Sequence, residues 1–506
     1  MFEGSTSDVA LLETMSRALR TERKAIAERL LAAGQLCQRR MSSVDAADRA
    51  QWCIDNWEAV AAEVAAELGI SQGRASSQMN YGVQLIERLP KLGALFASGA
   101  IEYRIVIIAV FRTGLITDAD ILDAVDTRLA QQAAGWNTCS EEKLKEKIDW
   151  FVRELDPHAV RLARQADDDR HIETAPAADG MAEIYGRVRA SDAAAFDQRL
   201  DQLAATVCRD DPRTARQRRS DALGAWANGD STMCCDCGSD DCPARSGNDS
   251  GPGQIVIHLL ADSTTVTGES DTPALLPGYG AIPADDSGPG QIVIHLLADS
   301  TTVTGESDTP ALLPGYGAIP ADTVRALAAR AKLRPVIGGK ELSAEPQYRP
   351  STALAEFIRC RDLTCRFPGC DRPASVADID HTVPYPLGPT HPSNLKLLCR
   401  LHHLLKTFYA GPRGWTDRQL PDGTVIWTSP SGRTYRTKPG GTLFFPQLFP
   451  PTTELNLPDN ATQPRQPGRG VMMPARRRTR AQDRADRIRW ERGLNEARAA
   501  AHPPPF

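Results

Sequence analysis

Two closely spaced pairs of metal-ligand side chains constrain the fold of this chain more than any other feature. The first pair is Cys365 and Cys370, and the second pair is Cys399 and His402. Two such pairs of thiolate and imidazole ligands are the usual way in which a protein builds a closed, tetrahedral zinc site. The sequence therefore predicts a structural zinc ion that holds the two pairs together. Cys360 remains an alternative member of the first pair.

The polar residues around these pairs are of the types used in metal-assisted phosphodiester hydrolysis. They are Asp380, His381, Asn394 and His403. A histidine can take a proton from an attacking water molecule near neutral pH. Carboxylate and imidazole groups can hold a divalent cation against a phosphate group. We therefore expect a second, catalytic site next to the zinc site.

The two adjacent histidines are expected to belong to different sites. A helix that begins near Cys399 would place Cys399 and His402 on one face, since they are three residues apart. His403 would then lie about 100° further round the helix axis. We therefore assign His402 to the zinc ion and His403 to the catalytic site.

This order of residues resembles the HNH nuclease motif, a ββα unit that holds a catalytic metal ion and is often accompanied by a structural zinc ion. The resemblance covers roughly residues 350–410. The chain differs from the commonest zinc-bearing version in two ways. Its first pair is spaced C-x4-C instead of C-x2-C, and its fourth ligand is His402 instead of a cysteine. Residues 414–437 follow with the alternation and turn residues of a hairpin, which we expect to support the unit.

The resemblance implies a role for each polar residue. His381 would be the general base, and Asp380 and His403 would hold Mg²⁺ or Mn²⁺. Asn394 would fix the loop that orients the base. The implied activity is hydrolysis of DNA by an HNH endonuclease. Two alternatives stay open: a zinc-bearing protein that binds nucleic acid without cutting it, and a helical interaction protein with a vestigial nuclease site.

The composition limits what else the chain can be. With 506 residues, 41% hydrophobic and 24% charged, it is long enough for two or three domains. A net charge of −5 restricts nucleic-acid binding to local basic patches. The N-terminal residues lack a signal-peptide pattern, and the longest apolar stretch, 105–111, is too short to span a bilayer.

The twelve cysteines are mostly clustered, which is typical of metal sites in a reducing compartment. We expect a cytoplasmic protein without membrane contact. Because no P-loop motif occurs, we expect no nucleotide cofactor. The oligomeric state does not follow from the sequence.

Residues from about 10 to 230 are predicted to be mostly helical. Runs rich in Ala, Leu, Glu and Arg occur at 60–68, 79–89, 121–131 and 140–163, with breaks at Gly69, Pro90 and Gly135-Trp136. Segment 64–79 has a weak helix-turn-helix pattern. This half of the chain resembles the actinobacterial family DUF222, which includes the mycobacterial 13E12 repeat proteins. Proteins of that family usually carry a C-terminal HNH domain, so the two resemblances support each other.

A second cysteine cluster follows the helical part. Cys235, Cys237 and Cys242 are the expected ligands of a second zinc ion, and His258 is a candidate for the fourth ligand. The alternative is an acidic loop whose thiols are reduced and bind no metal. No function beyond stabilising the fold follows from this cluster.

A tandem repeat follows, because residues 249–285 and 286–322 are identical. Each copy contains a strand pattern that begins at Gln254 or Gln291. Two copies are too few for a self-standing solenoid. We expect that one copy occupies a single strand position, while the spare copy forms a neighbouring strand or a loop.

The C-terminal part is expected to be a disordered linker and a basic tail. Residues 451–474 are rich in Pro, Gly, Thr and Asn, and arginines then recur up to residue 498. An arginine-rich tail can neutralise phosphates and hold a nuclease near DNA. The candidate residues are Arg476, Arg477, Arg478, Arg480 and Arg484. The alternative is a solvated, partly helical tail without a partner.

These observations predict an α+β protein of several domains. Residues 1–230 would form a helical DUF222-like domain, and residues 231–348 a small β-containing region with the cysteine cluster and the duplication. Residues 349–445 would form the zinc-stapled HNH domain with the following hairpin, and residues 446–506 the linker and basic tail.

Overall fold

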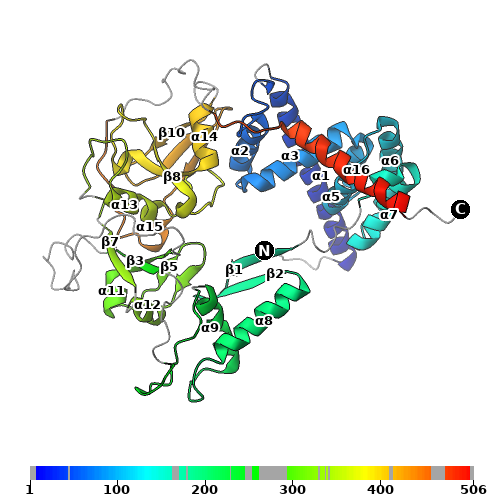
Figure 1. The fold of residues 1–506 in the computed structure, drawn as a ribbon. Helices are drawn as coiled ribbons and strands as arrows, with labels where there is room; N and C mark the ends of the chain where they lie inside the picture. Colours follow the sequence, from blue (N-terminus) through cyan, green and yellow to red (C-terminus); the bar gives the residue numbers. More distant parts are fainter. Residues whose placement is uncertain are drawn as a thin grey trace.

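The computed structural model describes residues 7–43, 46–161, 170–177, 180–227, 229–244, 254–260, 293–328, 331–336, 338–339, 342–409, 414–456 and 473–501. Over these residues the chain is a mixed α+β protein, as the sequence predicts. Helices make up the N-terminal part, a mixed sheet lies in the middle, and small antiparallel sheets accompany the C-terminal cysteines (Figure 1).

A bundle of helices forms the N-terminal unit. Its elements are α1 (Asp8–Met41), α2 (Asn56–Leu68), α3 (Gln72–Glu87), α4 (Pro90–Ala97), α5 (Tyr103–Arg112), α6 (Ala119–Gln132), η2 (Ala133–Trp136), α7 (Glu141–Leu155) and η3 (Pro157–Ala159). Several helices begin after a side chain that accepts a hydrogen bond from the first turn, as at Asp55 and Ser71. Gly69 ends α2 with a φ of 62°, a left-handed conformation that favours glycine. The predicted breaks at Gly69 and Pro90 therefore coincide with helix ends.

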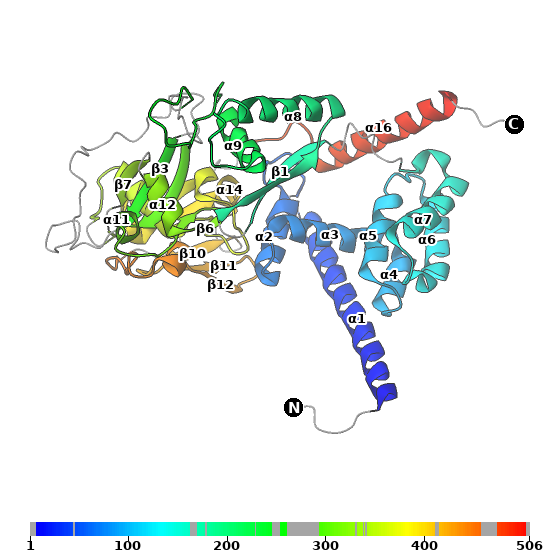
Figure 2. The same cartoon turned by 90° about the horizontal axis from the view of Figure 1, so that it is seen from below.

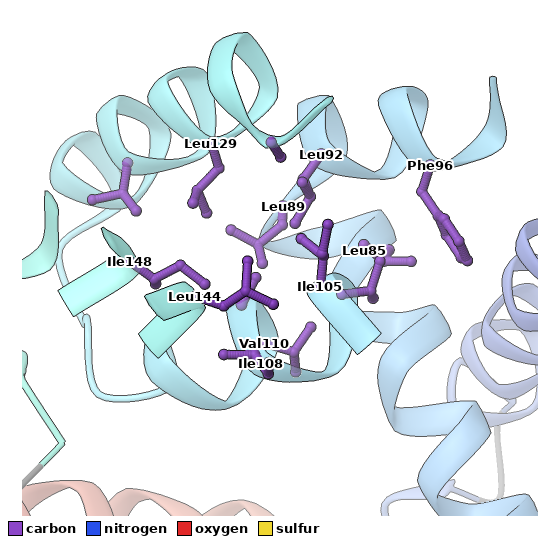
Figure 3. Packing of buried hydrophobic residues seen from close by; sticks show 14 of the residues in the cluster. Leu85, Leu89, Leu92, Phe96, Ile105, Ile108, Val110, Leu129, Leu144 and Ile148 are labelled. Carbon is purple, nitrogen blue, oxygen red and sulfur yellow. The ribbon is translucent and has the colours of Figure 1, made fainter. Parts of the chain in front are cut away.

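The larger apolar core of this unit consists of aliphatic and aromatic side chains, most of them from α3 to α7. Figure 3 shows how these side chains point toward one another from separate helices. Buried members include Leu85, Leu92, Phe96, Ile105, Leu129, Leu144 and Ile148. Most of the helical periodicity seen in the sequence is thus explained by packing.

The prediction that residues up to about 230 are mostly helical is incomplete. An antiparallel hairpin of β1 (His171–Pro176) and β2 (Ala182–Arg187) precedes α8 (Ala190–Ala204) and α9 (Ala215–Ala227). Nearly every residue of both strands is exposed. Since neither strand has a buried face, the apolar alternation by which a strand is recognised in a sequence is missing.

Both copies of the duplicated segment contribute a strand to one five-stranded sheet. Its order is β6-β5-β4-β3-β7. The strands are β3 (Gln254–Leu260), β4 (Val293–Asp299), β5 (Ala311–Leu313), β6 (Gly317–Ile319) and β7 (Lys332–Val336), with helices α11 (Ser300–Thr304) and α12 (Ala321–Ala328). The strand of the first copy, β3, lies parallel to its twin β4 on one side and to β7 on the other. Of the two expectations for the spare copy, the neighbouring strand is the one observed. The rest of the first copy lies outside the described residues.

The segment with the predicted metal ligands folds into a strand pair followed by a helix. Strands β8 (Ala377–His381) and β9 (Leu395–Cys399) are antiparallel, and α14 (Arg400–Phe408) follows β9 directly. Before them lie α13 (Thr352–Asp362) and η5 (Ala374–Val376), and η6 (Pro392–Asn394) precedes β9. The predicted hairpin is a three-stranded sheet of β10 (Thr416–Gln419), β11 (Val425–Thr428) and β12 (Thr434–Thr437), followed by α15 (Gly441–Phe444).

The C-terminal tail is not a disordered segment where the structure describes it. Residues 480–501 form the helix α16 (Arg480–Ala501), which lies along the N-terminal helices in both views (Figures 1 and 2). Its arginines find acidic partners there, such as Asp55 for Arg480 and Asp156 for Arg492. These ion pairs order a sequence that the composition alone predicts to be disordered. Residues 457–472 of the predicted linker lie outside the described residues.

No membrane-spanning helix is found among the described helices, because none is long and apolar enough to cross a bilayer.

Candidate metal centre and adjoining polar site

The four predicted zinc ligands come together between α14 and the loop that precedes β8. One ligand atom from each of Cys365, Cys370, Cys399 and His402 lies within 4.8 Å of the others. The Cys399 and Cys365 sulfurs are 3.3 and 3.5 Å from His402 Nδ1, and the Cys370 and Cys399 sulfurs are 4.0 Å apart. Around a tetrahedral zinc ion, with Zn–S bonds of about 2.3 Å, ligand atoms lie about 3.6–3.8 Å apart. The cluster can therefore hold a metal ion such as zinc.

A tight turn and a strand-to-helix junction place these ligands. Gly369, with a φ of 74°, allows the turn in which the Cys370 N–H donates to the Phe367 carbonyl at 3.1 Å. Strand β9 ends at Cys399, and one turn of α14 brings His402 back to the same side. The Phe367 ring stacks on the His402 imidazole at 4.0 Å and fixes its plane.

Cys360, the alternative ligand, is not part of this cluster. It belongs to a separate apolar core with Phe357 and Leu395. Burial raises the pKa of its thiol far above the usual range, so it stays protonated. Cys399 behaves in the opposite way, since hydrogen bonds with the thiols of Cys365 and Cys370 hold the pKa of Cys399 well below its usual range. A lowered pKa favours the thiolate, which is the form that binds metals.

Gln72 of the helical unit reaches the cluster and was not identified from the sequence. Its Oε1 lies 2.9 Å from His402 Nε2, and its own Nε2 donates to Glu58 Oε2 at 2.6 Å. Because an amide oxygen only accepts, His402 carries its proton on Nε2 and turns the Nδ1 lone pair toward the sulfurs. Gln72 begins the second helix of the predicted helix-turn-helix, so this helix N-terminus faces the metal cluster. The contact was not visible in the sequence, because Gln72 and His402 meet only when α3 packs near α14.

Asp380 lies in a buried group of charges that the sequence revealed only in part. Its Oδ2 accepts from Lys396 Nζ at 2.8 Å and from Lys406 Nζ at 2.6 Å. Both ammonium groups also pair with Asp417. The strand register puts Lys396 directly opposite Asp380, and Lys406 lies one turn after His403 on α14. The helical spacing of Lys406 from His403 could have identified Lys406 from the sequence. Lys396 could not be identified in this way, because its position follows only from the pairing of β8 with β9.

The lysines fix the ionisation of Asp380. Burial by itself raises the pKa of this carboxyl group, but the ammonium groups of Lys396 and Lys406 outweigh burial and hold the pKa well below its usual range. Burial lowers the pKa of Lys406. Asp380 is therefore a carboxylate at any pH near neutral, and its second oxygen stays available for another partner.

His403 faces that second oxygen. Its Nε2 lies 3.5 Å from Asp380 Oδ1, and its Nδ1 lies 2.9 Å from Asp378 Oδ2. The Asp378 carboxylate accepts a proton from Nδ1 and orients the ring, so a cation can bind only through Nε2, the nitrogen that faces Asp380. At this distance His403 Nε2 and Asp380 Oδ1 can both serve as ligand atoms for one cation. Ligand atoms on adjacent positions of an octahedral magnesium ion are about 3.0 Å apart.

His381 follows Asp380 in β8 but has different neighbours. Its Nε2 lies 2.9 Å from the Thr390 hydroxyl, which itself donates to the Gln347 carbonyl at 2.6 Å. Because a hydroxyl has a single proton, His381 must be the donor in the first contact, and its Nδ1 keeps a lone pair. Burial lowers the pKa of His381, so the ring is neutral at neutral pH. Tyr348 stacks on the ring, which is only 6% exposed.

Asn394 fixes the loop between β8 and β9. The fully buried side chain accepts from the Val383 N–H at 2.8 Å and donates to the carbonyls of Val383 and Pro389, both at 2.9 Å. Gly388 is required beside it, since a Cβ there would meet Asn394 Nδ2 at 2.5 Å. These contacts are those of a residue that holds the loop next to His381.

The second cysteine cluster has a different fourth member from the one predicted. Cys235, Cys237 and Cys242 lie together, and Cys208 joins them, with the four ligand atoms within 4.8 Å of one another. His258 lies in β3 and is not part of this group. Helix α9 packs against α8, so the cysteines that follow α9 lie beside Cys208. Ligand spacing along the sequence does not reveal this proximity.

Four of the five candidate nucleic-acid-binding arginines of the tail contact this chain's own residues. Arg476 and Arg480 pair with Asp55, Arg484 donates to Gln84, and Arg478 pairs with Asp486. Arg477 lies in the same exposed stretch. A role of these five arginines in DNA binding remains a prediction.

Several proteins of known sequence resemble this chain over nearly its whole length. The uncharacterized protein Rv2100 of Mycobacterium tuberculosis is 44% identical over 99% of this chain and 90% of its own length. The uncharacterized protein Rv3776 of the same species is 44% identical over 96% of this chain and 90% of its own length. No solved structure matches the chain.

A family profile also matches the chain, over residues 17–288 and again over residues 286–362. The second match begins at residue 286, which is the first residue of the second repeat copy. The profile describes a domain of unknown function, DUF222. Because these matches cover well over half of the chain, the protein belongs to the DUF222 family.

Proposed function

We propose that this protein is a metal-dependent endonuclease of the HNH type that hydrolyses phosphodiester bonds in DNA. Strands β8 and β9 and helix α14 follow one another in the ββα order of that nuclease unit. A cluster of three cysteines and a histidine lies at the start of the helix, where HNH proteins often carry a structural zinc ion.

The observation that carries this proposal is the pair formed by Asp380 and His403. The two donor atoms face each other at 3.5 Å, and Asp378 orients the imidazole from behind. The adjacent His402 is turned to the cysteines. Two neighbouring histidines of one helix thus have different partners, as expected if one stabilises the fold and the other serves the reaction.

A divalent cation such as Mg²⁺ or Mn²⁺ at Asp380 and His403 would stabilise negative charge that develops on the phosphate. Lys396 and Lys406 keep Asp380 ionised, but they also offset its charge. The protein groups around the cation therefore carry little net negative charge, and oxygens of the substrate phosphate would complete its coordination. This is the usual arrangement for magnesium, which often binds through one or two carboxylates together with phosphate oxygens.

His381 would act as the general base through Nδ1. Thr390 holds the proton on Nε2, and burial keeps the ring neutral. Nδ1 can then accept a proton from the water that attacks phosphorus. Asn394 fixes the loop that carries this residue and so orients the ring.

The surface around His381 suits a nucleic acid. Tyr348 is 59% exposed and Tyr385 is 37% exposed, and both rings lie beside the His381 ring. Aromatic faces of this kind can stack on bases of nucleic acids. The side chain of Arg400, which is 64% exposed near Asp378, adds a positive charge that can contact a phosphate.

A second candidate is a nucleic-acid-binding protein that does not cleave. The low exposure of His381 under Tyr348 favours it, because a covered base cannot reach a water molecule unless Tyr348 moves. In that case the same aromatic and arginine side chains would bind DNA, and the zinc cluster would only stabilise the fold.

The adjacent histidines provide a sharp test. Plasmid nicking is measured with Mg²⁺ or Mn²⁺ for the wild type, His403→Ala and His402→Ala, together with the zinc content of each protein. We expect His403→Ala to keep its zinc and to lose nicking, and His402→Ala to lose zinc. Nicking that is unchanged in His403→Ala would contradict the proposed cation site. A gel shift of the wild type without nicking would support the binding protein instead.

A further inference from the structure

The segment that contains α8 and α9 has a small apolar core. Its buried hydrophobic side chains within residues 190–244 are Leu200, Leu203, Val207, Ala222, Met233 and Cys235. Units of this size gain little stability from hydrophobic burial alone, and natural ones often add disulfides or a metal ion. All described cysteines are free, so no disulfide supplies the missing stability.

Four thiols of this segment lie close enough together to bind a metal ion that would stabilise it. Cys208 follows α8, and Cys235, Cys237 and Cys242 lie in the loop after α9. The sulfurs all lie within 4.8 Å of one another, and those of Cys208 and Cys235 are 3.4 Å apart. Four sulfurs around a tetrahedral zinc ion are about 3.8 Å apart. The cluster therefore needs only small shifts to coordinate zinc.

The backbone around the thiols is held in place by contacts that do not involve a metal. The Cys235 N–H donates to the Ala244 carbonyl at 3.1 Å, and Gly238, with a φ of 72°, allows the turn between Cys237 and Cys242. Asp211 accepts from the Asp236 N–H at 3.1 Å. The loop with Cys208 and the loop with Cys235 are thus joined before any ion binds, which favours metal binding.

We propose that Cys208, Cys235, Cys237 and Cys242 bind one structural zinc ion that fastens the loop after α9 to the end of α8. Four thiolates in tetrahedral arrangement select zinc or iron over magnesium and calcium. Because all four positions are taken by protein sulfurs, the ion has no open position for a substrate. This site is separate from the cluster at Cys365, and it does not depend on the proposed nuclease activity.

Metal analysis of the full chain tests this site. We expect two zinc ions per wild-type chain, one in Cys208→Ser and one in Cys365→Ser. Cys234→Ser is the matched control, because Cys234 adjoins the cluster without belonging to it, and it should retain two. One zinc ion in the wild type that disappears in Cys365→Ser would overturn the proposal. Two zinc ions in Cys208→Ser, or iron in place of zinc, would also overturn it.

A second measurement uses the wild type and so does not depend on the folding of a variant. Cys208, Cys237 and Cys242 are only partly buried, so without a metal their thiols should react with an alkylating reagent. We expect these thiols to be protected in the purified protein and to become reactive after a zinc chelator is added, as mapped by mass spectrometry. Cys139, also partly buried, should react equally in both conditions. Equal reactivity of the cluster thiols before and after chelation would contradict zinc binding here.

Discussion

At the residue scale, the direction of single hydrogen bonds decides what each histidine can do. The Thr390 hydroxyl leaves His381 with a lone pair on Nδ1, and the Gln72 amide leaves His402 with a lone pair on Nδ1. Asp378 has the opposite effect on His403 and leaves the lone pair on Nε2. Three imidazoles within one small segment are thus prepared for three different partners.

Thr390 is expected to be a positioning residue for His381. In Thr390→Val the His381 proton loses its acceptor, and the ring is no longer held in one tautomer. We expect the kcat of DNA cleavage to fall about tenfold, the equivalent of one hydrogen bond of about 1–1.5 kcal/mol, while KM changes little. Thr390→Ser keeps the hydroxyl and should restore the rate. A Thr390→Ser variant as slow as Thr390→Val would point to packing instead.

His391 gives the fold a dependence on pH. Its Nδ1 accepts from the Ser393 N–H at 3.1 Å, at the start of the turn that carries Asn394. Burial lowers the pKa of His391 below its ordinary value of 6.5. His391 therefore binds a proton more readily in the unfolded chain than in the folded one. The neutral His391 ring stabilises the fold fully above about pH 6.5, and this stabilisation is lost as pH falls through the folded pKa.

The effect of His391 on the pH dependence of stability can be isolated with a variant whose side chain at this position does not titrate. His391→Asn keeps an acceptor at this position and has no pKa in the range. Thermal unfolding is measured at pH 7.5 and 5.5. We expect the melting temperature of the wild type to fall more than that of His391→Asn. Equal falls in both proteins would show that His391 does not contribute.

At the scale of elements, the sequence predicted most of the residues of the candidate site. It did not predict the residues that distant elements bring to these residues. The strand-helix junction at Cys399 follows from helical spacing, and this spacing separates His402 from His403. Lys396 and Cys208 become visible only when β8 pairs with β9 and when α9 folds back. The exposed hairpin β1–β2 has no buried face and hence no signal in the sequence.

The contact between α3 and α14 is expected to tune the zinc site. Gln72→Leu removes the acceptor that holds His402, and loss of such a contact typically weakens metal affinity by about 10–100-fold. Competition with a chromogenic chelator measures the affinity. Gln131→Leu, an exposed glutamine at the end of α6, is the matched control and should not change it. Identical zinc affinities in both variants would contradict a role for Gln72.

The duplicated strand should be dispensable. Val293 of β4 is the counterpart of Val256 of β3, which pairs with Lys332 of β7. When residues 249–285 are deleted, β4 can take the place of β3 beside β7 with the same register. We expect the shortened protein to keep its zinc content and its cleavage rate. Loss of zinc or of cleavage would show that the first copy has become part of the fold.

At the scale of the whole molecule, the tail helix and the segment of the metal cluster both contact the N-terminal helical unit. The tail helix α16 pairs with it through Arg480 and Arg492. Tyr409, which directly follows α14, donates from its hydroxyl to the Ile54 carbonyl at 2.9 Å. The composition of the tail predicts disorder, because the acidic partners that order it lie far away in the sequence. These contacts join the cluster of Cys365, Cys370, Cys399 and His402, the helical unit and the tail into one connected structure.

The central claim is that His381 removes a proton during cleavage of a phosphodiester bond. The most direct measurement is the single-turnover rate of DNA cleavage with Mg²⁺ or Mn²⁺, for wild type and His381→Ala of equal zinc content. His171→Ala, at an exposed histidine of β1, controls for loss of an imidazole. We predict that His381→Ala is slower by about 10²–10⁴-fold, as for loss of a general base, and that His171→Ala is unchanged. Equal rates for the wild type and His381→Ala would contradict the claim.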